Sequence, residues 1–288
     1  MSEKGFGAYP YLKKKEKPVI RFRIKAVLLI TLVVFAFCFV IYMAEANINS
    51  KLSNSVGFSA DSTILSSQTP SEKSEESTET TQPEQNIINP VPASDPLSET
   101  YFSKCVFVGD SITVGLADYQ LVPVKNVFAE IGLNIEKINT ETMKTTYGDV
   151  TAIDALKEAK PENVYIMLGS NGISWLSASD MIGYYSEFVD EIKKQLPDTK
   201  IYILSVPPVT AARETAAEEP ILNSDVDKYN SELLKMADEK EIYYVDINTA
   251  LKGNDGKFPS DMAEKDGMHF VKTTYSVMLN YILSHTAK

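Results

Sequence analysis

The sequence predicts an α/β fold of three layers (α/β/α), in which helices cover both faces of a mostly parallel five-stranded sheet. From residue 101 onward, short runs of β-branched and aromatic residues alternate with segments whose apolar residues recur at helical spacing. Strands that alternate with helices in this way are typical of parallel sheets. The runs predicted to be strands are 105–108, 124–131, 163–168, 200–206 and 241–247.

The segments between these runs predict the helices. Residues 149–159 place apolar side chains on one side and end before Pro161, which does not continue a helix. Residues 179–196 carry the longest apolar stripe at helical spacing. Further helices are predicted at 225–240 and 272–284, and another begins directly after the first strand.

Two segments at the start of the chain predict a membrane anchor ahead of the domain at 101–288. Residues 1–25 are rich in Lys and Arg, and residues 26–43 contain no charged side chain. As a helix, residues 26–43 are about 27 Å long, which is enough to cross the hydrocarbon core of a bilayer. The basic flank predicts a cytoplasmic N-terminus, and thus a single-pass protein of the cell membrane with an extracytoplasmic domain.

A cleaved signal peptide is the alternative, because Ala44-Glu45-Ala46 resembles a cleavage site. The apolar run is longer than the usual ~7–15 residues of a signal peptide, which favours an uncleaved signal anchor. Residues 44–100 are rich in Ser, Thr, Glu and Pro. Such a segment buries too little apolar surface to offset its ordering entropy, so it predicts a disordered linker.

Three short motifs carry the side chains that suggest chemistry. Gly109-Asp110-Ser111 ends the first predicted strand, and a tight turn there exposes a serine hydroxyl. Gly169-Ser170-Asn171 follows the third strand, and Asp266-Gly267-Met268-His269 lies in a late loop. The other histidine of the chain is His285. Because the carboxyl ends of parallel strands share one edge of the sheet, Ser111 and Asn171 are expected to meet there.

Each of these residues also has an ordinary structural explanation. Asn171 is a suitable cap for the next turn, Asp266 a suitable turn residue, and His269 a suitable packed aromatic side chain. What favours a shared site is their joint occurrence, with two of the three motifs at predicted strand ends.

The three motifs, in this order, resemble those of the SGNH hydrolases, also called GDSL-type esterases and lipases. The resemblance covers about residues 101–288 and implies a sheet of the SGNH or flavodoxin-like type. It also implies a catalytic triad, in which Ser111 is the nucleophile, His269 the general base and Asp266 the group that orients the base.

The resemblance further implies an oxyanion hole. Its donors are expected to be the backbone N–H of Ser111, the backbone N–H of a separate glycine and the side-chain amide of Asn171. Gly132 is our choice for that glycine, and Gly148 is the alternative. Many members of the family have Asp after the asparagine block, whereas this chain has Gly172.

Two more residues are candidates for substrate binding on weaker grounds. Asp110 is expected either to contact substrate or to fix the turn before the nucleophile. Trp175, the one tryptophan of the chain, is expected either to floor the substrate cleft or to lie in the core.

The expected function is that of a serine esterase that removes small acyl groups, such as acetyl, from an acylated small molecule or from a cell-envelope or extracellular glycan. The alternatives are an O-acyltransferase with the same triad and a catalytically silent glycan-binding module. The formal charge of -11 argues against a nucleic-acid partner. No cofactor is expected, and a zinc site is disfavoured because one loop histidine among scattered carboxylates lacks ligand spacing. The sequence leaves the oligomeric state open.

Overall fold

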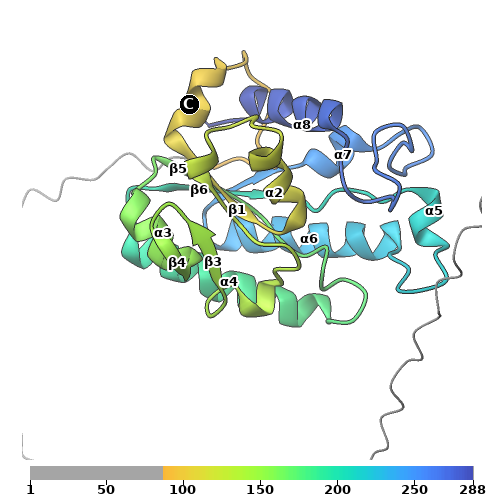
Figure 1. Ribbon diagram of the computed structural model, residues 1–288, viewed down its shortest axis with the longest axis horizontal. Coiled ribbons are helices and arrows are strands. Elements are labelled where there is room, and N and C mark those ends of the chain that lie inside the picture. The colour runs from red at the N-terminus through yellow and green to blue at the C-terminus, as the bar shows by residue number, and fades with distance from the viewer. Residues whose placement is uncertain (1–86, 288) are drawn as a thin grey trace, which may run out of the picture. The chain divides into compact units, whose positions relative to one another are not determined.

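The sheet contains five strands in the order β2-β1-β5-β6-β7, and every neighbouring pair runs parallel. A computed structural model describes residues 87–287 (Figure 1). The strands are β1 (Cys105–Gly109), β2 (Val127–Ala129), β5 (Asn163–Met167), β6 (Lys200–Leu204) and β7 (Tyr243–Val245). The predicted five-stranded parallel sheet is therefore confirmed.

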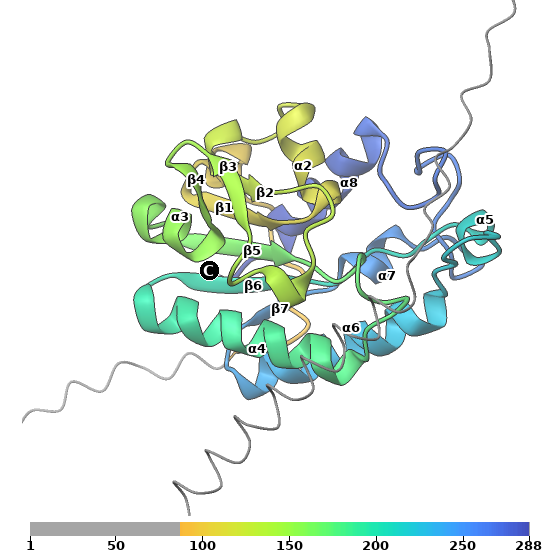
Figure 2. The same cartoon turned by 60° about the horizontal axis from the view of Figure 1, so that its bottom comes forward.

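Helices cover both faces of the sheet, as Figure 2 shows. One face packs against α3 (Ala152–Ala159), α4 (Ala178–Gln195) and α6 (Asn223–Glu239), and the other against α2 (Ser111–Asp118), α7 (Ile247–Leu251) and α8 (Lys272–Ser284). Successive residues of a strand point to opposite faces. In β5, Val164 and Ile166 accordingly belong to the first core, whereas Tyr165 and Met167 belong to the second.

The strand order creates a crevice at one edge of the sheet. The chain passes from β1 to β2 on one side, and then crosses to β5 on the other side of β1. Open α/β sheets bind ligands at such a reversal of strand order, outside the carboxyl ends of the strands. The segments that leave β1 and β5 carry Asp110-Ser111 and Ser170-Asn171.

The close approach of β1 to β5 explains the glycine before the nucleophile. Gly109 is paired with Met167. A Cβ atom at Gly109 would lie 2.7 Å from the Met167 carbonyl oxygen and 2.0 Å from the Thr113 hydroxyl. Because no side chain fits in that space, a glycine must end β1.

Several predicted elements have the wrong bounds: the strands predicted at 200–206 and 241–247 are shorter, at Lys200–Leu204 and Tyr243–Val245, and two further elements differ more. Of the strand predicted at 124–131, only β2 is extended, because Val124–Asn126 forms a 3-10 turn. The helix predicted at 149–159 begins at Ala152, where the Thr151 side chain caps it by accepting from the Asp154 N–H. The preceding residues instead form an antiparallel hairpin of β3 (Thr142–Thr145) and β4 (Gly148–Thr151), which was not predicted.

The other long helices agree with the prediction. The ends of α4 and α6 lie within two residues of the predicted ends, and α8 has the predicted bounds. The short helices α5 (Ala211–Glu214) and α7 were not predicted.

Part of the predicted linker is packed against the domain. The Asn89 side chain donates to the Ile242 carbonyl at 2.9 Å and accepts from the Tyr244 N–H at 2.7 Å. The N–H of Val91, which is 6 % exposed, donates to the Tyr244 carbonyl at 2.8 Å. This segment therefore satisfies backbone groups of the edge strand β7. Residues 87–100 thus belong to the folded domain rather than to a linker.

The remaining predictions for the first part of the chain concern residues 1–25, 26–43 and 44–86, which lie outside the described residues. Within residues 87–287, no helix combines the length and the apolar character that a membrane crossing requires.

Candidate active site

The nucleophile candidate lies at the start of a helix. β1 ends at Gly109, and Ser111 is the first residue of α2. Asp110 is the N-cap, and its Oδ1 accepts a hydrogen bond from the N–H of Ile112 at 3.0 Å. Backbone N–H groups at a helix start have no partner within the helix and lie at its positive end. The position of Ser111 therefore favours negative charge that develops beside its hydroxyl.

A tight loop holds the histidine and its carboxylate together. Asp266 Oδ1 accepts from the backbone N–H groups of Met268 and His269, both at 3.0 Å. Asp266 Oδ2 lies 2.5 Å from Nδ1 of His269. The N–H of Thr210 donates to the Gly267 carbonyl at 2.9 Å, which attaches the loop to the segment after β6. One aspartate thus fixes both the backbone and the ring of His269.

The structure brings Ser111, His269 and Asp266 into one chain of hydrogen bonds. His269 Nε2 lies 2.8 Å from Ser111 Oγ, although the residues are 158 positions apart. Partial burial raises the pKa of Asp266, but the N–H groups of Met268 and His269 outweigh this and hold that pKa below its usual value. A carboxylate therefore faces one side of the ring and a hydroxyl faces the other.

The side-chain amide of Asn171 points into the same region. Its Nδ2 donates to the Leu133 carbonyl at 3.1 Å and to Asp110 Oδ2 at 3.4 Å. An N–H···O distance of 3.4 Å is longer than the usual range of about 2.7–3.2 Å, so the second bond is weak. Asn171 is thus linked through Asp110 to the turn that carries Ser111.

Asp110 is a buried part of this region rather than a surface group. It is 1 % exposed, and its Oδ2 accepts from the Ser170 hydroxyl at 2.5 Å. Burial raises the pKa of the Asp110 carboxyl, while the bonds from Ser170 and from the Ile112 N–H act in the opposite direction. Of the two expected roles, the structure supports fixing the turn. Ser170 was not predicted to take part, and its one signal was its place between Gly169 and Asn171.

Of the two glycine candidates, Gly132 directly precedes a residue that is hydrogen-bonded to Asn171. It has φ +78 in a turn that is closed by a 3.2 Å bond from the Leu133 N–H to the Glu130 carbonyl. The carbonyl of Leu133, the next residue, accepts from Asn171. Gly148 instead begins β4 and accepts from the Thr145 hydroxyl in the hairpin turn.

Trp175 lies at the surface, so the alternative that placed it in the core is wrong. The side chain is 57 % exposed. Its indole Nε1–H donates to the backbone carbonyl of Asn171 at 2.7 Å. The ring is therefore exposed, yet its polar end is fixed to the residue that carries the candidate oxyanion donor.

Sequence comparison relates most of this domain to a known family. The sequence model of the GDSL-like Lipase/Acylhydrolase family matches residues 107–277, more than half of the 288 residues. The N-acylneuraminate cytidylyltransferase of Escherichia coli O18:K1:H7 is 32% identical over 124 residues, which are 42% of this chain and 27% of that protein. The chain thus spans about a quarter of the length of that relative.

Solved structures resemble this chain at low sequence identity. A chain from Streptococcus pneumonia, provisionally described as a platelet activating factor, has a TM-score of 0.50 and 16% identity, and the match covers 64% of this chain and 87% of that one. An acetylxylan esterase from Geobacillus stearothermophilus has a TM-score of 0.45 and 16% identity, covering 64% and 94%. At such identity a structural likeness concerns the fold alone. The family match is the stronger finding, and by it this chain belongs to the GDSL-like lipase/acylhydrolase family.

Proposed function

We propose that Ser111, His269 and Asp266 are the catalytic triad of an esterase that removes short acyl groups from a glycan outside the cytoplasm. The observation that carries the triad is the unbroken series of contacts from the Ser111 hydroxyl through both ring nitrogens of His269 to Asp266, with distances of 2.8 Å and 2.5 Å. A hydroxyl becomes a useful nucleophile when a neighbouring base accepts its proton as it attacks.

The reaction runs in two steps at one serine. Ser111 Oγ attacks the ester carbonyl carbon while His269 Nε2 accepts the hydroxyl proton, and the C–O bond to the alcohol then breaks as His269 returns that proton to the leaving oxygen. Water attacks the resulting acyl-serine, again giving a proton to His269, and the carboxylic acid leaves as Ser111 regains its proton. Asp266 stabilises the imidazolium that forms in each step.

The oxyanion of each tetrahedral intermediate needs hydrogen-bond donors. We assign them to the backbone N–H of Ser111, the backbone N–H of Gly132 and the side-chain amide of Asn171. The amide nitrogen of Asn171 has two acceptors, of which Asp110 is the more distant at 3.4 Å. The developing oxyanion therefore takes over the hydrogen that Asp110 holds weakly.

The glycan part of the proposal is supported by Trp175. Burying an exposed tryptophan side chain removes a large apolar area from water. The flat CH-rich face of a sugar ring is a suitable partner to stack on that side chain. The bond from the indole to the Asn171 carbonyl fixes the ring beside the assigned oxyanion donor. The alcohol portion of a sugar ester would thus stack on Trp175 while its acyl carbon faces Ser111.

The proposed location outside the cytoplasm is supported by the sequence of the first part of the chain. Residues 26–43 are an uncharged apolar run that follows a basic segment. As an anchor, this run would retain the chain in the membrane during extraction with alkaline carbonate. A chain that lacks residues 1–43 should remain in the soluble fraction, and equal extraction of both chains would contradict the anchor.

The enzymatic part is tested with Ser111→Ala and p-nitrophenyl acetate. The variant should lose about 10⁴-fold or more in kcat, because no other group supplies the nucleophile. Ser103→Ala, which removes an exposed hydroxyl bonded to the Thr100 carbonyl, is the matched control. Release of acetate from an acetylated polysaccharide by the wild type, but not by Ser111→Ala, tests the glycan. If Ser111→Ala kept the wild-type rate, the assignment would be refuted.

A further inference from the structure

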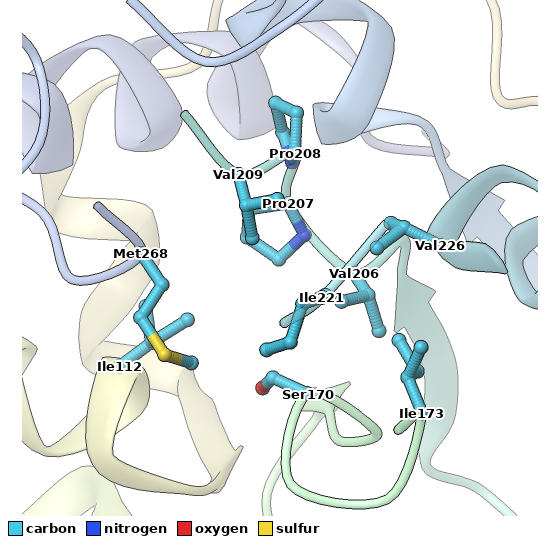
Figure 3. Close-up of a pocket in the computed structure, with 10 residues that line it drawn as sticks. All are labelled: Ile112, Ser170, Ile173, Val206, Pro207, Pro208, Val209, Ile221, Val226 and Met268. Atoms are coloured by element: carbon cyan, nitrogen blue, oxygen red, sulfur yellow. The ribbon is translucent and has the colours of Figure 1, made fainter. Parts of the chain in front are cut away.

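A small apolar cavity is lined by ten residues, three of which are chain neighbours of proposed site residues. Figure 3 shows the lining side chains. Ile112, Ser170 and Met268 line the cavity, and each is the immediate chain neighbour of a proposed site residue, namely the nucleophile, the oxyanion asparagine and the general base. Because one peptide unit spans only ~3.8 Å, the cavity adjoins the point where these three residues meet. An acyl group bound to Ser111 therefore has this space within reach.

The lining leaves the cavity without a free hydrogen-bonding side chain. Ser170 carries the one polar side chain among the ten lining residues, and its hydroxyl already donates to Asp110 at 2.5 Å. The opposite wall consists of aliphatic side chains and prolines, including Val206, Ile221 and Val226. A polar occupant would lose its bonds to water there, whereas an apolar one would gain by burial.

The size of the cavity limits the occupant to one small group. Its volume is about 10 Å³. About 10–15 Å³ on this scale is what a single water-sized group occupies. A methyl group is therefore close to the limit, and a longer chain would have to displace the walls.

Hydrogen bonds from α6 hold one of these walls in place. The side chain of Asn230 accepts from the Val206 N–H at 2.8 Å and donates to the Val206 carbonyl at 2.9 Å. The side chain of Asn223 makes the same pair of bonds with Val209, both at 2.9 Å. The two prolines between these valines have fixed φ angles. A wall bound at both ends does not move aside for a longer acyl chain.

We propose that this cavity binds the methyl group of an acetyl ester, and that Ile221 together with the Val206–Val209 wall restricts the enzyme to short acyl chains. This inference rests on the proposed function, since it names the acyl group for the same nucleophile. The inference goes beyond the proposed function by naming the residues that limit the length of the substrate's acyl chain.

The test compares p-nitrophenyl acetate, butyrate and hexanoate as substrates of the full chain. The wild type should lose at least about tenfold in kcat/KM from acetate to butyrate, the effect expected when a pocket discriminates by methylene groups. Ile221→Ala should raise the butyrate-to-acetate ratio of kcat/KM by at least about tenfold. Ile221→Val removes a single methyl group and should raise the same ratio by a smaller factor.

Ile242→Ala is the matched control, because Ile242 and Ile221 are both 4 % exposed and Ile242 does not line the cavity. It should keep the wild-type ratio, and circular dichroism should show whether each variant is folded. A wild type that hydrolyses hexanoate as well as acetate would overturn the inference, even if Ile221→Ala failed to fold. An unchanged ratio in folded Ile221 variants would overturn it as well. Absence of turnover for every ester, in contrast, would refute the proposed function itself.

Discussion

The nucleophile side and the oxyanion side of the site differ in how completely their hydrogen bonds are formed without substrate. On the nucleophile side, Ser111, His269 and Asp266 are joined at 2.8 Å and 2.5 Å. On the oxyanion side, the Asn171 amide donates to the Leu133 carbonyl at 3.1 Å and to Asp110 at 3.4 Å. The first side is assembled in advance, whereas the second uses a donor that already has acceptors.

This difference separates two kinds of contribution to catalysis. In the proposed mechanism Ser111 and His269 act in series, because proton transfer stops when either is missing, and Asp266 supports them by orienting and stabilising the imidazole. Donors of the oxyanion side act in parallel, because the remaining N–H groups still stabilise the charge when one donor is lost. We therefore expect substitutions on the nucleophile side to have the larger effects.

The largest effect is expected for His269→Ala. Without the imidazole the Ser111 proton has no acceptor, so kcat for p-nitrophenyl acetate should fall by about 10⁴-fold or more. His285→Ala is the matched control, since that ring stacks on Tyr281 near the end of α8. A His269→Ala variant that kept a tenth of the wild-type kcat would remove the distinction between the two sides.

A smaller effect is expected for Asn171→Ala. Loss of one oxyanion donor should raise the activation free energy by about 2.7–4 kcal/mol, which is roughly a 10²–10³-fold fall in kcat with little change in KM. Asn280→Ala, at an exposed position of α8, should leave both parameters unchanged. An equal loss from Asn171→Ala and His269→Ala would show that the oxyanion donors do not act in parallel.

Asp110→Asn should reduce activity less again. The variant replaces the buried acceptor of the Ser170 hydroxyl and of the Asn171 amide with a neutral group. A hydrogen bond to a charged group contributes about 1.5–3 kcal/mol and a neutral one about 0.5–1.5 kcal/mol, so losing the charge should cost about 1–1.5 kcal/mol, roughly a tenfold fall in kcat at an unchanged KM. A rise in KM without a change in kcat would instead indicate that Asp110 contacts the substrate.

The same variant gives a prediction for stability against pH. Because burial raises the folded-state pKa of Asp110 above the ordinary 3.8, its contribution to stability is complete below about 3.8 and is lost as the pH rises through the raised pKa. The free energy of unfolding of the wild type, relative to Asp110→Asn, should therefore decrease as the pH rises above about 3.8 and through the raised pKa. Urea unfolding of both proteins at several pH values measures this difference. If the difference in free energy of unfolding between the two proteins did not change with pH, burial would not raise the pKa of Asp110.

The smallest effect is expected for Trp175→Ala, and for glycan substrates alone. An aromatic stacking contact contributes about 1 kcal/mol, so KM for an acetylated polysaccharide should rise roughly fivefold. The rate with p-nitrophenyl acetate should not change, because that substrate has no sugar ring. Val277→Ala, which truncates an exposed apolar side chain on α8, is the control. Equal effects on both substrates would indicate that Trp175 acts by holding Asn171.

The sequence predicted the positions of those candidate residues that depend on local patterns. Ser111 and Asn171 follow buried strands, and Asp266 lies three residues before His269 in one loop. Each of these arrangements can be recognised within a short stretch of sequence. The bond between Ser170 and Asp110 joins residues 60 positions apart, and no local pattern reveals it.

Elements without a strong period were harder to predict. Val150 fits the apolar stripe of a helix as well as a strand, and it is the pairing with Met143 across the hairpin that makes it extended. The cavity was not predicted either. Ile221 and Ile112 meet there from segments more than a hundred residues apart, and only the tertiary fold brings them together.

The most direct measurement of the central claim is covalent labelling of the wild type with a fluorophosphonate, followed by mass spectrometry of its peptides. A serine hydroxyl that is hydrogen-bonded to a base attacks the phosphorus, gives its proton to that base and displaces fluoride, which leaves a stable adduct. We therefore predict one labelled residue, Ser111, and no label in His269→Ala. An unlabelled Ser111, or equal labelling of Ser111 with and without His269, would contradict the account.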